Sequence, residues 1–499
     1  MVSEHSDPAA TARIGDPAPD SADATLNELP LLPRERIWGF WDYSAVNVGL
    51  AVATWAFLQG AAVAYYVGAV QAIASIVIGY ALSVLLVSLA PCIPSAKYGI
   101  EQFVALRSVF GGNGARIVMI TMSALFAAAW SAVLAIMFGH GLVIVLDQLF
   151  GVHLAQSTAA VSLLALAAVV MSWLILSRGP VSVEAVSRVV APALILIVIG
   201  LLVKIFTEWS WSELASLPAL GPPDDPHTSF MIAIELNIAG GFAWWPNVGN
   251  LARLTRSPRA AFWPNWVGLF LASVVAAVVG VFAALALQID EPTQWMIPLG
   301  GVVLGVIALV VVGLANVTSI LSQGYASMVA LKGGGGNLLR RVAWPIMGLF
   351  ILGPAAVLVF FPAAVYDNYG RFLSWGAMLV APLCAIQLVD FFVLRRRTLR
   401  VRDLYLPNSV SCYGYWNGFN IFAFAAVAAG ATVYALLLNP FTYVPSALFP
   451  YMTASIPAFI VAGVVHYLLT RFVVQPSGKG GYGEIRAQAT PTSTEGQQT

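Results

Sequence analysis

The 499-residue sequence has little charge, because Asp, Glu, Lys and Arg together make up only 9% of it. About 25% of the residues are charged in an average soluble domain. Hydrophobic residues account for 59%, and apolar runs of about 20 residues, each long enough to cross roughly 30 Å of hydrocarbon, recur along the chain. The net charge of +1 provides no field that would attract nucleic acid, so we expect no nucleic-acid partner.

Cysteine is also scarce. Cys92, Cys384 and Cys412 are scattered and form neither a metal-binding motif nor a disulfide framework. No nucleophile-base pair, phosphate-binding loop or metal-ligand spacing stands out. The sequence therefore predicts neither an enzyme nor a bound cofactor.

The apolar runs predict an all-α polytopic protein, with the lipid bilayer as its surroundings. Twelve spans are expected at about 40–64, 68–93, 117–147, 156–177, 187–207, 229–251, 262–287, 299–329, 342–361, 372–394, 416–438 and 451–473. Because twelve is even, both termini should lie on the same side of the membrane.

The basic residues predict the orientation. With a cytoplasmic N-terminus, only Lys204 and Arg371 of the 24 Lys and Arg residues fall outside. The sequence thus predicts a multi-pass protein of the plasma membrane with both termini in the cytoplasm. Residues 1–36 and 476–499 are expected to be disordered cytoplasmic tails around a transmembrane domain of residues 37–475. Arg395–Arg397 is interpreted as the cytoplasmic stop after the tenth span.

Polar residues interrupt two of the spans. In the sixth, Glu235, Asn237, the pair Gly240-Gly241 and Pro246 interrupt an apolar run, and the first is interrupted at Asn47 and Gly49. Backbone without helical hydrogen bonds is tolerated at membrane depth only where protein covers it or where it lines a cavity. Two broken helices five spans apart predict an inverted-repeat transporter, with halves at about 40–207 and 229–394 and two additional helices at about 416–473.

The eighth span carries side-chain oxygens within GLANVTSILSQGYAS. Thr318 and Ser319 could join carbonyls of a broken helix around a small hard cation such as Na⁺. The alternative is that each hydroxyl bonds the carbonyl one turn back. Asn316 and Gln323 add further polar groups to the same helix.

Trp130 lies among alanines in the third span, where it could be a flat wall for a planar ligand, with Phe242 as the opposing wall. Packing is the alternative for both rings. Glu235 is the residue that costs most to leave unpaired in a membrane. Three roles are open to it: binding substrate, carrying a proton, or staying protonated and bonded to a neighbouring helix.

About residues 34–475 resemble the nucleobase-cation-symport-1 family, which includes cytosine and purine permeases and the bacterial hydantoin transporter. The resemblance rests on WDYSAVNVG in the first span, FVALRSVFG after the second, RGPVSVEAVSRVVAP entering the fifth, LANVTSILSQGYAS in the eighth and LVDFFVLRRRTLRVRDLY after the tenth. The last motif is the most specific. The resemblance implies a five-plus-five inverted-repeat (LeuT-like) fold with two extra helices, and import of planar nucleobase-like heterocycles with a cation.

The resemblance also implies roles for individual residues. Asn47 falls at a polar substrate-contacting position, Trp130 on the third-helix aromatic that stacks on substrate, and Gly241 or Phe242 on its sixth-helix counterpart. The implied Na⁺ site comprises backbone carbonyls of Tyr43, Val46 and Ala315 and the hydroxyls of Thr318 and Ser319.

The sequence departs from the family where hydrogen bonds to substrate are expected. Leu134 stands where the hydantoin transporter has Gln, and Gly324, beside Gln323, where it has Asn. Glu235 and Asn237 are not general to the family. The predicted substrate-binding set is therefore Asn47, Trp130, Glu235, Asn237, Gly241, Phe242 and Gln323.

The leading hypothesis is a Na⁺-coupled symporter, a monomer or weak oligomer, for a planar nitrogen heterocycle. The alternatives are a proton-coupled symporter that uses Glu235 and an amino-acid or amine carrier on the same fold.

Overall fold

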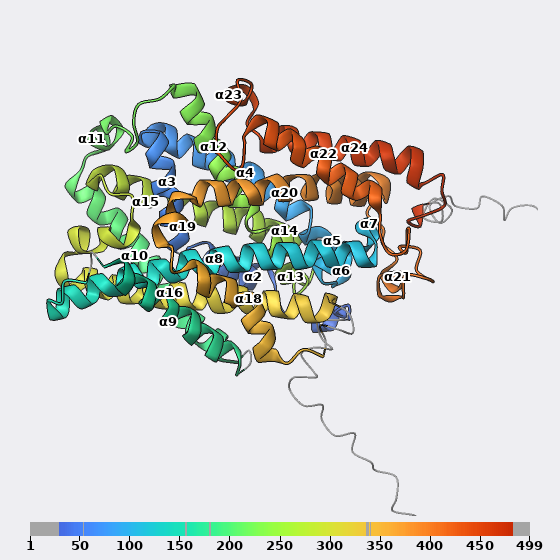
Figure 1. The fold of residues 1–499 in the computed structure, drawn as a ribbon, viewed down its shortest axis with the longest axis horizontal. Helices are drawn as coiled ribbons and strands as arrows, with labels where there is room; N and C mark the ends of the chain where they lie inside the picture. The colour runs from blue at the N-terminus through green and yellow to red at the C-terminus, as the bar shows by residue number, and fades with distance from the viewer. Residues whose placement is uncertain are drawn as a thin grey trace, which may run out of the picture.

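The computed structural model describes residues 29–52, 54–154, 157–178, 181–335, 339 and 341–482. Within these residues the chain is helical and contains no β-strand. Figure 1 shows the longer helices running side by side along the longest axis of the molecule. Most of the two expected tails, residues 1–28 and 483–499, lies outside the described residues.

Each predicted span coincides with one helix or with consecutive helices. In chain order they are α2 (Phe40–Ala51) with α3 (Thr54–Tyr66), α4 (Ala69–Leu89), α8 (Gly112–Phe150), α9 (Thr158–Leu176), α10 (Val181–Glu208), α12 (Pro226–Phe242) with α13 (Trp245–Ala252), α14 (Pro258–Trp263) with η2 (Pro264–Leu269) and α15 (Phe270–Leu287), α16 (Met296–Gly334), α18 (Trp344–Leu358), α20 (Tyr369–Leu388) with η4 (Val389–Leu394), α22 (Ile421–Leu437), and α24 (Ser455–Leu469) with η5 (Thr470–Val474).

Shorter helices lie in the connections. They are η1 (Pro33–Glu35), α5 (Cys92–Tyr98), α6 (Gln102–Ala105), α7 (Arg107–Phe110), α11 (Trp211–Ser216), η3 (Pro292–Trp295), α19 (Pro362–Asp367), α21 (Val401–Tyr405) and α23 (Phe449–Met452). By length and hydropathy, seven of the described helices can cross a membrane, or eight if the bent pair α2 and α3 counts as one span. The apolar helices α18 and α22 have only 15 and 17 residues and are not among these.

The packing of the helices repeats after five spans. α3 packs against α15 and α12 against α4, so the first span pairs with the seventh and the sixth with the second. α8 packs against α16, and α9 against α18, which pairs the third span with the eighth and the fourth with the ninth. If each span is replaced by the span five places away in the other half, the same set of pairs results. The two predicted halves are therefore present in the packing, with α22 and α24 side by side at one edge (Figure 1).

Glycine allows the two contacts between the halves to be close. A Cβ atom added to Gly60 on α3 would collide with the carbonyl oxygen of Ala277 on α15. A Cβ added to Gly79 on α4 would lie 2.5 Å from the Cβ of Asn237 on α12. Small residues bring helix backbones together in membranes, where packing rather than hydrophobic burial drives helix association.

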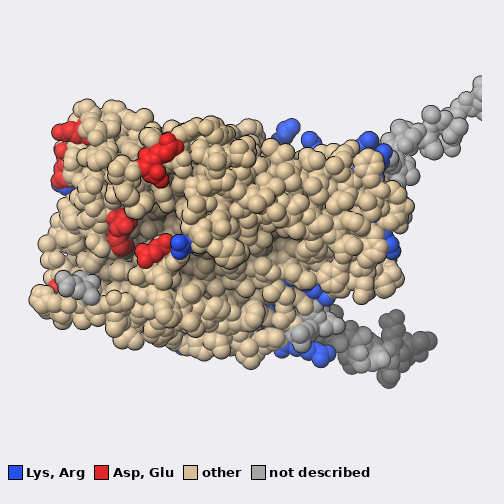
Figure 2. All heavy atoms as spheres, turned by 45° about the horizontal axis from the view of Figure 1, so that its top comes forward, with Lys and Arg blue, Asp and Glu red and all other residues tan. Residues whose placement is uncertain are grey.

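The charged residues separate to the two ends of the molecule. Figure 2 shows Asp and Glu gathered toward one end of this face, and most of the visible Lys and Arg toward the other, with a broad uncharged surface between them. This uncharged surface is the region that the hydrocarbon of a bilayer would cover.

Candidate functional site

The first span is broken between α2 and α3, whose axes differ by 54°. Val52 leaves the helical conformation with φ −82° and ψ 77°, and α3 begins at Thr54. The predicted interruption at Asn47 and Gly49 therefore lies about one turn too early, because both residues belong to α2.

The sixth span is interrupted at Ala243 and Trp244, between α12 and α13. The predicted break at Gly240-Gly241 is wrong, since both glycines lie inside α12. Their role is close packing against α4, where a Cβ on Gly241 would collide with the Oγ of Ser83. Gly241 is thus a helix-packing position.

Five aromatic side chains meet beside the two interruptions. The ring of Trp55 lies 5.3 Å from that of Trp244 and 6.0 Å from that of Trp130. Trp130 in turn lies 6.0 Å from Tyr369 and 5.4 Å from Phe372. We call these residues the aromatic cluster. Its members come from the first, third, sixth and tenth spans, so the cluster exists only in the folded bundle.

The predicted opposing wall, Phe242, is not part of this cluster. It is fully buried, and among the described residues its ring contacts none of the five. Trp244 is the ring that the sixth span contributes. Ala243 and Trp244 keep right-handed helical dihedral angles, so two residues still correspond to about 200° of rotation and Phe242 and Trp244 face nearly opposite directions. Sequence reasoning missed Trp55 and Trp244, although each adjoins an interruption.

A buried hydrogen-bond network adjoins the cluster. The amide nitrogen of Gln59 donates to the carbonyl of Leu236 at 3.0 Å and to Oδ1 of Asn237 at 3.4 Å. The hydroxyl of Tyr369 donates to Oε1 of Gln59 at 2.8 Å. Asn237 also donates to the carbonyl of Ala233 at 2.8 Å. The side chain of Asn237 therefore holds the sixth span against the first, and its predicted contact with substrate stays a prediction.

Glu235 caps a neighbouring helix. Its Oε2 accepts hydrogen bonds from the backbone N–H groups of Ala454, at 3.0 Å, and Ser455, at 3.1 Å. Its Oε1 accepts one from the Ser455 hydroxyl at 2.5 Å. These groups form the N-terminus of α24, where the helix dipole favours negative charge. Of the three roles open to Glu235, the geometry matches bonding to a neighbouring helix.

The candidate cation ligands on α16 lie close to the break in the first span. The Thr318 hydroxyl donates to the carbonyl of Ala315 at 2.9 Å, which is the bond to the carbonyl one turn back that is the alternative to cation binding for this residue. One residue away, Asn316 accepts a hydrogen bond from the hydroxyl of Thr54, the first residue of α3. Ser319 is half-buried on the same helix. The eighth span therefore meets the first at its break.

The other predicted ligands lie further away along their helices. Tyr43 and Val46 are inside α2, where helical N–H groups already bond their carbonyls. This geometry does not favour them as Na⁺ ligands. Asn47 is fully buried, with its Cβ 3.2 Å from where a Cβ on Gly268 would stand. Gln323 is half-buried on α16, roughly 10 Å along the helix from Asn316.

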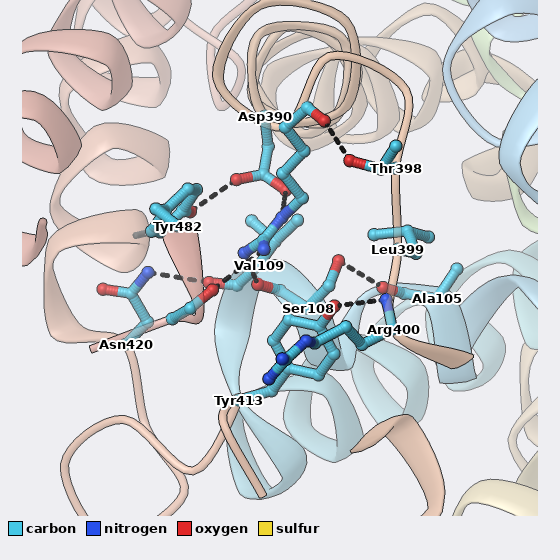
Figure 3. Close-up of polar contacts among 12 residues, drawn as sticks. Ala105, Ser108, Val109, Asp390, Thr398, Leu399, Arg400, Tyr413, Asn420 and Tyr482 are labelled. Carbon is cyan, nitrogen blue, oxygen red and sulfur yellow. Dashed lines mark hydrogen bonds and ion pairs between the residues drawn. The ribbon is translucent and has the colours of Figure 1, made fainter. Parts of the chain in front are cut away.

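A second buried polar cluster lies where the tenth span ends (Figure 3). Nε of Arg395 lies 2.6 Å from Oδ2 of Asp390, and both side chains are at most 1% exposed. Nη1 of Arg395 donates to the carbonyl of Gly480 at 2.9 Å, and Nη2 donates to that of Ser108 at 2.6 Å. Arg395 is therefore buried where the tenth span ends, whereas Arg396 and Arg397 are exposed, and the interpretation of the three as a cytoplasmic stop stays a prediction.

The segment after the twelfth span completes this second cluster. The hydroxyl of Tyr482 donates to Oδ1 of Asp390 at 2.5 Å, as Figure 3 shows. The Arg395 guanidinium lies 4.1 Å from the centre of the Tyr482 ring. Gly480 and Gly481 have φ of 77° and 67°, a left-handed conformation that favours glycine and that turns the chain toward this contact. We call Asp390, Arg395 and Tyr482 the inner anchor. The folded chain thus continues past the expected boundary at residue 475.

An all-α bundle with two packed five-span halves, and with polar and aromatic side chains gathered where two helices are interrupted, is a membrane transporter of the inverted-repeat class. Residues 30–456 match the family described as permeases for cytosine/purines, uracil, thiamine and allantoin, and the chain belongs to this family.

Individual relatives agree with this assignment. The chain is 24% identical over 477 residues to the purine-uracil permease NCS1 of Arabidopsis thaliana, which covers 88% of this chain and 76% of that protein. A 62-residue stretch, 12% of either chain, is 37% identical to the allantoin permease of Bacillus subtilis.

Solved structures show the same fold. Mhp1, a nucleobase-cation-symport-1 family transporter, in a closed conformation with bromovinylhydantoin bound, matches with a TM-score of 0.71 at 18% identity, over 92% of this chain and 99% of that one. Inward-facing Mhp1 matches with a TM-score of 0.72 at 18% identity, over 92% and 97% of the two chains. The predicted family and fold class are confirmed.

Proposed function

We propose that the protein is a Na⁺-coupled symporter that carries a nucleobase or a related planar nitrogen heterocycle into the cell. The observation that carries this proposal is the aromatic cluster at the two interruptions. Flat rings bind the faces of planar heterocycles by stacking, with about 1–3 kcal/mol per stacked base. The hydantoin bound to Mhp1, and the purines and uracil for which the Arabidopsis relative is named, belong to this chemical class.

The eighth span supports a cation site. The hydroxyls of Thr318 and Ser319 are hard oxygen ligands of the kind that Na⁺ prefers, whereas the Ala315 carbonyl lies inside α16 and already accepts the Thr318 hydroxyl. The last four carbonyls of a helix lack partners within that helix, so the end of α2 can supply further oxygens. In this proposal these carbonyls replace those of Tyr43 and Val46, which lie inside the helix.

The distribution of charge supports the orientation. The predicted cytoplasmic side receives all but two of the Lys and Arg residues, and acidic and basic residues gather toward opposite ends of the molecule (Figure 2). Both termini then lie in the cytoplasm of a cell whose plasma membrane holds the protein.

The proposal is tested by thermal unfolding of the purified full-length protein with nucleobases, hydantoins and allantoin, each with and without Na⁺. A ligand that binds only the folded state raises the unfolding temperature by mass action. We expect stabilisation by planar heterocycles and more of it with Na⁺. If amino acids or amines stabilise the protein and heterocycles do not, the proposed substrate is wrong.

The coupling ion has its own test. In the double variant Thr318→Ala and Ser319→Ala, two side-chain ligands are lost, and we expect Na⁺ to stop stimulating uptake of the heterocycle. Ser322→Ala is the matched control, because the Ser322 hydroxyl makes the same kind of bond to a carbonyl of α16 as that of Thr318, but Ser322 is not a predicted ion ligand. Full Na⁺ stimulation in the double variant would remove this ion site.

The alternatives that use Glu235 have less support. Its carboxylate already accepts three hydrogen bonds at the N-terminus of α24, at the side of the sixth span that faces the twelfth. These bonds hold the carboxylate against the twelfth span.

A further inference from the structure

Two tryptophans join the end of the fourth span to the start of the ninth, where α9 and α18 pack side by side (Figure 1). The indole Nε1 of Trp344, the first residue of α18, donates to the carbonyl of Leu176, the last residue of α9, at 2.8 Å. Trp173 on α9 makes the converse bond, because its Nε1 donates to the carbonyl of Pro345 at 2.9 Å. A Cβ on Gly348 would lie 3.2 Å from the Trp173 ring. The two helix ends are therefore held together closely.

Three basic residues surround this contact. Nζ of Lys332, near the end of α16, lies 5.4 Å from the centre of the Trp344 ring. Arg178 is two residues beyond Leu176, Arg341 is three residues before Trp344, and both are exposed. None of the three side chains forms an ion pair or a hydrogen bond with any residue that the structure describes. We call Arg178, Lys332 and Arg341 the basic rim.

The segments that carry the basic rim contain no acidic residue. The sequence has no Asp or Glu between Asp147 and Glu184, and none between Glu291 and Asp367. The aromatic neighbour of Trp344 on α16 is Tyr325, with 5.8 Å between the ring centres. Positive charges that no carboxylate in their own segments offsets attract a ligand that brings negative charge.

Apolar side chains continue from the basic rim along both helices. Leu174 on α9 and Ile346, Leu349 and Phe350 on α18 are between 49% and 60% exposed. Trp side chains commonly lie at the boundary between the hydrocarbon and the headgroups of a bilayer. Positive charge is thus offered at the depth of the headgroups, and apolar surface at the depth of the acyl chains.

We propose that the basic rim binds the headgroup of an anionic phospholipid whose acyl chains lie along α9 and α18. One such molecule brings both the negative charge and the apolar chains that this surface fits, whereas a free anion fits the charge alone. Basic clusters beside membrane-spanning helices attract anionic lipids. With the predicted orientation, the lipid belongs to the cytoplasmic leaflet. The inference concerns a site separate from the aromatic cluster and does not depend on what the protein transports.

The test measures lipid binding by the purified full-length protein in a neutral detergent. Dissociation constants are obtained by native mass spectrometry and by thermal-shift titration. The probes are dioleoylphosphatidylglycerol and dioleoylphosphatidylcholine, which share their acyl chains and differ in headgroup charge, and glycerol phosphate, an anion without acyl chains. The wild type is compared with Arg178→Gln, Lys332→Gln, Arg341→Gln and the triple variant that combines them.

We expect the wild type to bind phosphatidylglycerol more tightly than either of the other probes. Each single substitution should weaken this binding by about fivefold, which is the contribution of one Lys or Arg near an anionic headgroup. The triple variant should bind the two lipids equally. Without added lipid its unfolding temperature should match that of the wild type, because the substitutions break no ion pair or hydrogen bond among the described residues.

The matched control is the triple variant Arg396→Gln, Arg402→Gln and Lys479→Gln. It removes the same charge from three exposed side chains on the same predicted side of the membrane, outside the basic rim. This control should keep the preference of the wild type for phosphatidylglycerol.

Four results would overturn the inference. The wild type could bind both lipids equally, or the triple variant of the basic rim could keep the preference for phosphatidylglycerol. The control could lose as much affinity as that variant, which would make overall charge the cause. Glycerol phosphate could bind as tightly as phosphatidylglycerol, which would make the basic rim a site for a free anion. None of these measurements uses a transported substrate, so their outcome is separate from that of the proposed function.

Discussion

The aromatic cluster and the inner anchor are both buried and both rich in polar groups, but they differ in how those groups are paired. In the inner anchor, each nitrogen of the Arg395 guanidinium and each carboxylate oxygen of Asp390 has a partner. Beside the aromatic cluster, the described parts of the chain leave Trp244, Asn316 and Ser131 with polar atoms that have none.

Under the proposed function, this difference separates a structural site from a binding site. A buried ion pair whose hydrogen bonds are all made has no free donor or acceptor for a ligand, and its loss lowers the free energy of unfolding. Unpaired groups beside interrupted helices are free to bond a ligand. Substitutions in the inner anchor should therefore change stability, and those in the aromatic cluster should change binding.

The largest expected effect is on the inner anchor. Arg395→Ala leaves the buried Asp390 with only the Tyr482 hydroxyl and, 3.8 Å away, the His466 ring, and breaking a buried ion pair costs about 3–5 kcal/mol. We expect most of the folded protein to be lost, as measured by the monodisperse fraction in size-exclusion chromatography and by thermal unfolding. The exposed neighbour Arg396→Ala should behave like the wild type. Equal stability of the two variants would mean that Arg395 is solvated.

The next effect is on binding. Trp130→Ala and Trp244→Leu each remove a ring of the aromatic cluster and should weaken heterocycle binding by about 1–3 kcal/mol, measured by titration calorimetry. Phe242→Leu should leave affinity unchanged, because this ring does not contact the cluster. Loss of binding in Phe242→Leu but not in Trp244→Leu would restore Phe242 as the sixth-span wall.

A similar but purely structural effect is expected from Tyr482→Phe. It removes the hydrogen bond to Asp390, and hydrogen bonds to charged groups contribute about 1.5–3 kcal/mol. The unfolding temperature should fall while heterocycle affinity stays the same. Tyr451→Phe, at a tyrosine that is 73% exposed, should change neither quantity. A drop in affinity without a drop in stability would contradict the division between the two regions.

The smallest effect is expected at Glu235, which adjoins neither region. Glu235→Gln weakens the cap of α24 and should cost about 1–2 kcal/mol of stability. Uptake driven by a pH gradient in Na⁺-free buffer should be the same in the variant and the wild type. If the wild type shows such uptake and the variant loses it, Glu235 carries the proton. Glu208→Gln, at a surface pair with Lys204, is the control.

The sequence predicted the spans well because hydropathy is a local property. Each of the twelve apolar runs coincides with a described helix. The spacing of five spans between the two interrupted helices appears again in the way the helices pack. The interruptions themselves were placed a few residues early. Gly240 and Gly241 signal either a break or a close helix contact, and only the position of Ser83 on α4 decides between them.

Side-chain roles were harder to predict because they depend on what lies opposite in space. Trp130 could be selected from its small neighbours, but Trp244 and Trp55 were missed because the interruptions that they adjoin were placed too early along the chain. Arg395 looks like its two neighbours in the sequence. It is buried because Asp390, Ser108 and Gly480 surround it in the fold.

The sequence by itself determined that this chain is a helical membrane protein and where its helices lie along the chain. It also determined that the first and sixth spans are the interrupted pair. It could do so because the exclusion of charge from hydrocarbon acts on each segment separately. Only the tertiary structure decided which rings meet, which polar groups stay unpaired and that Glu235 caps a distant helix. These outcomes depend on the rotation of each helix against its neighbours, to which residues far apart in the sequence contribute together.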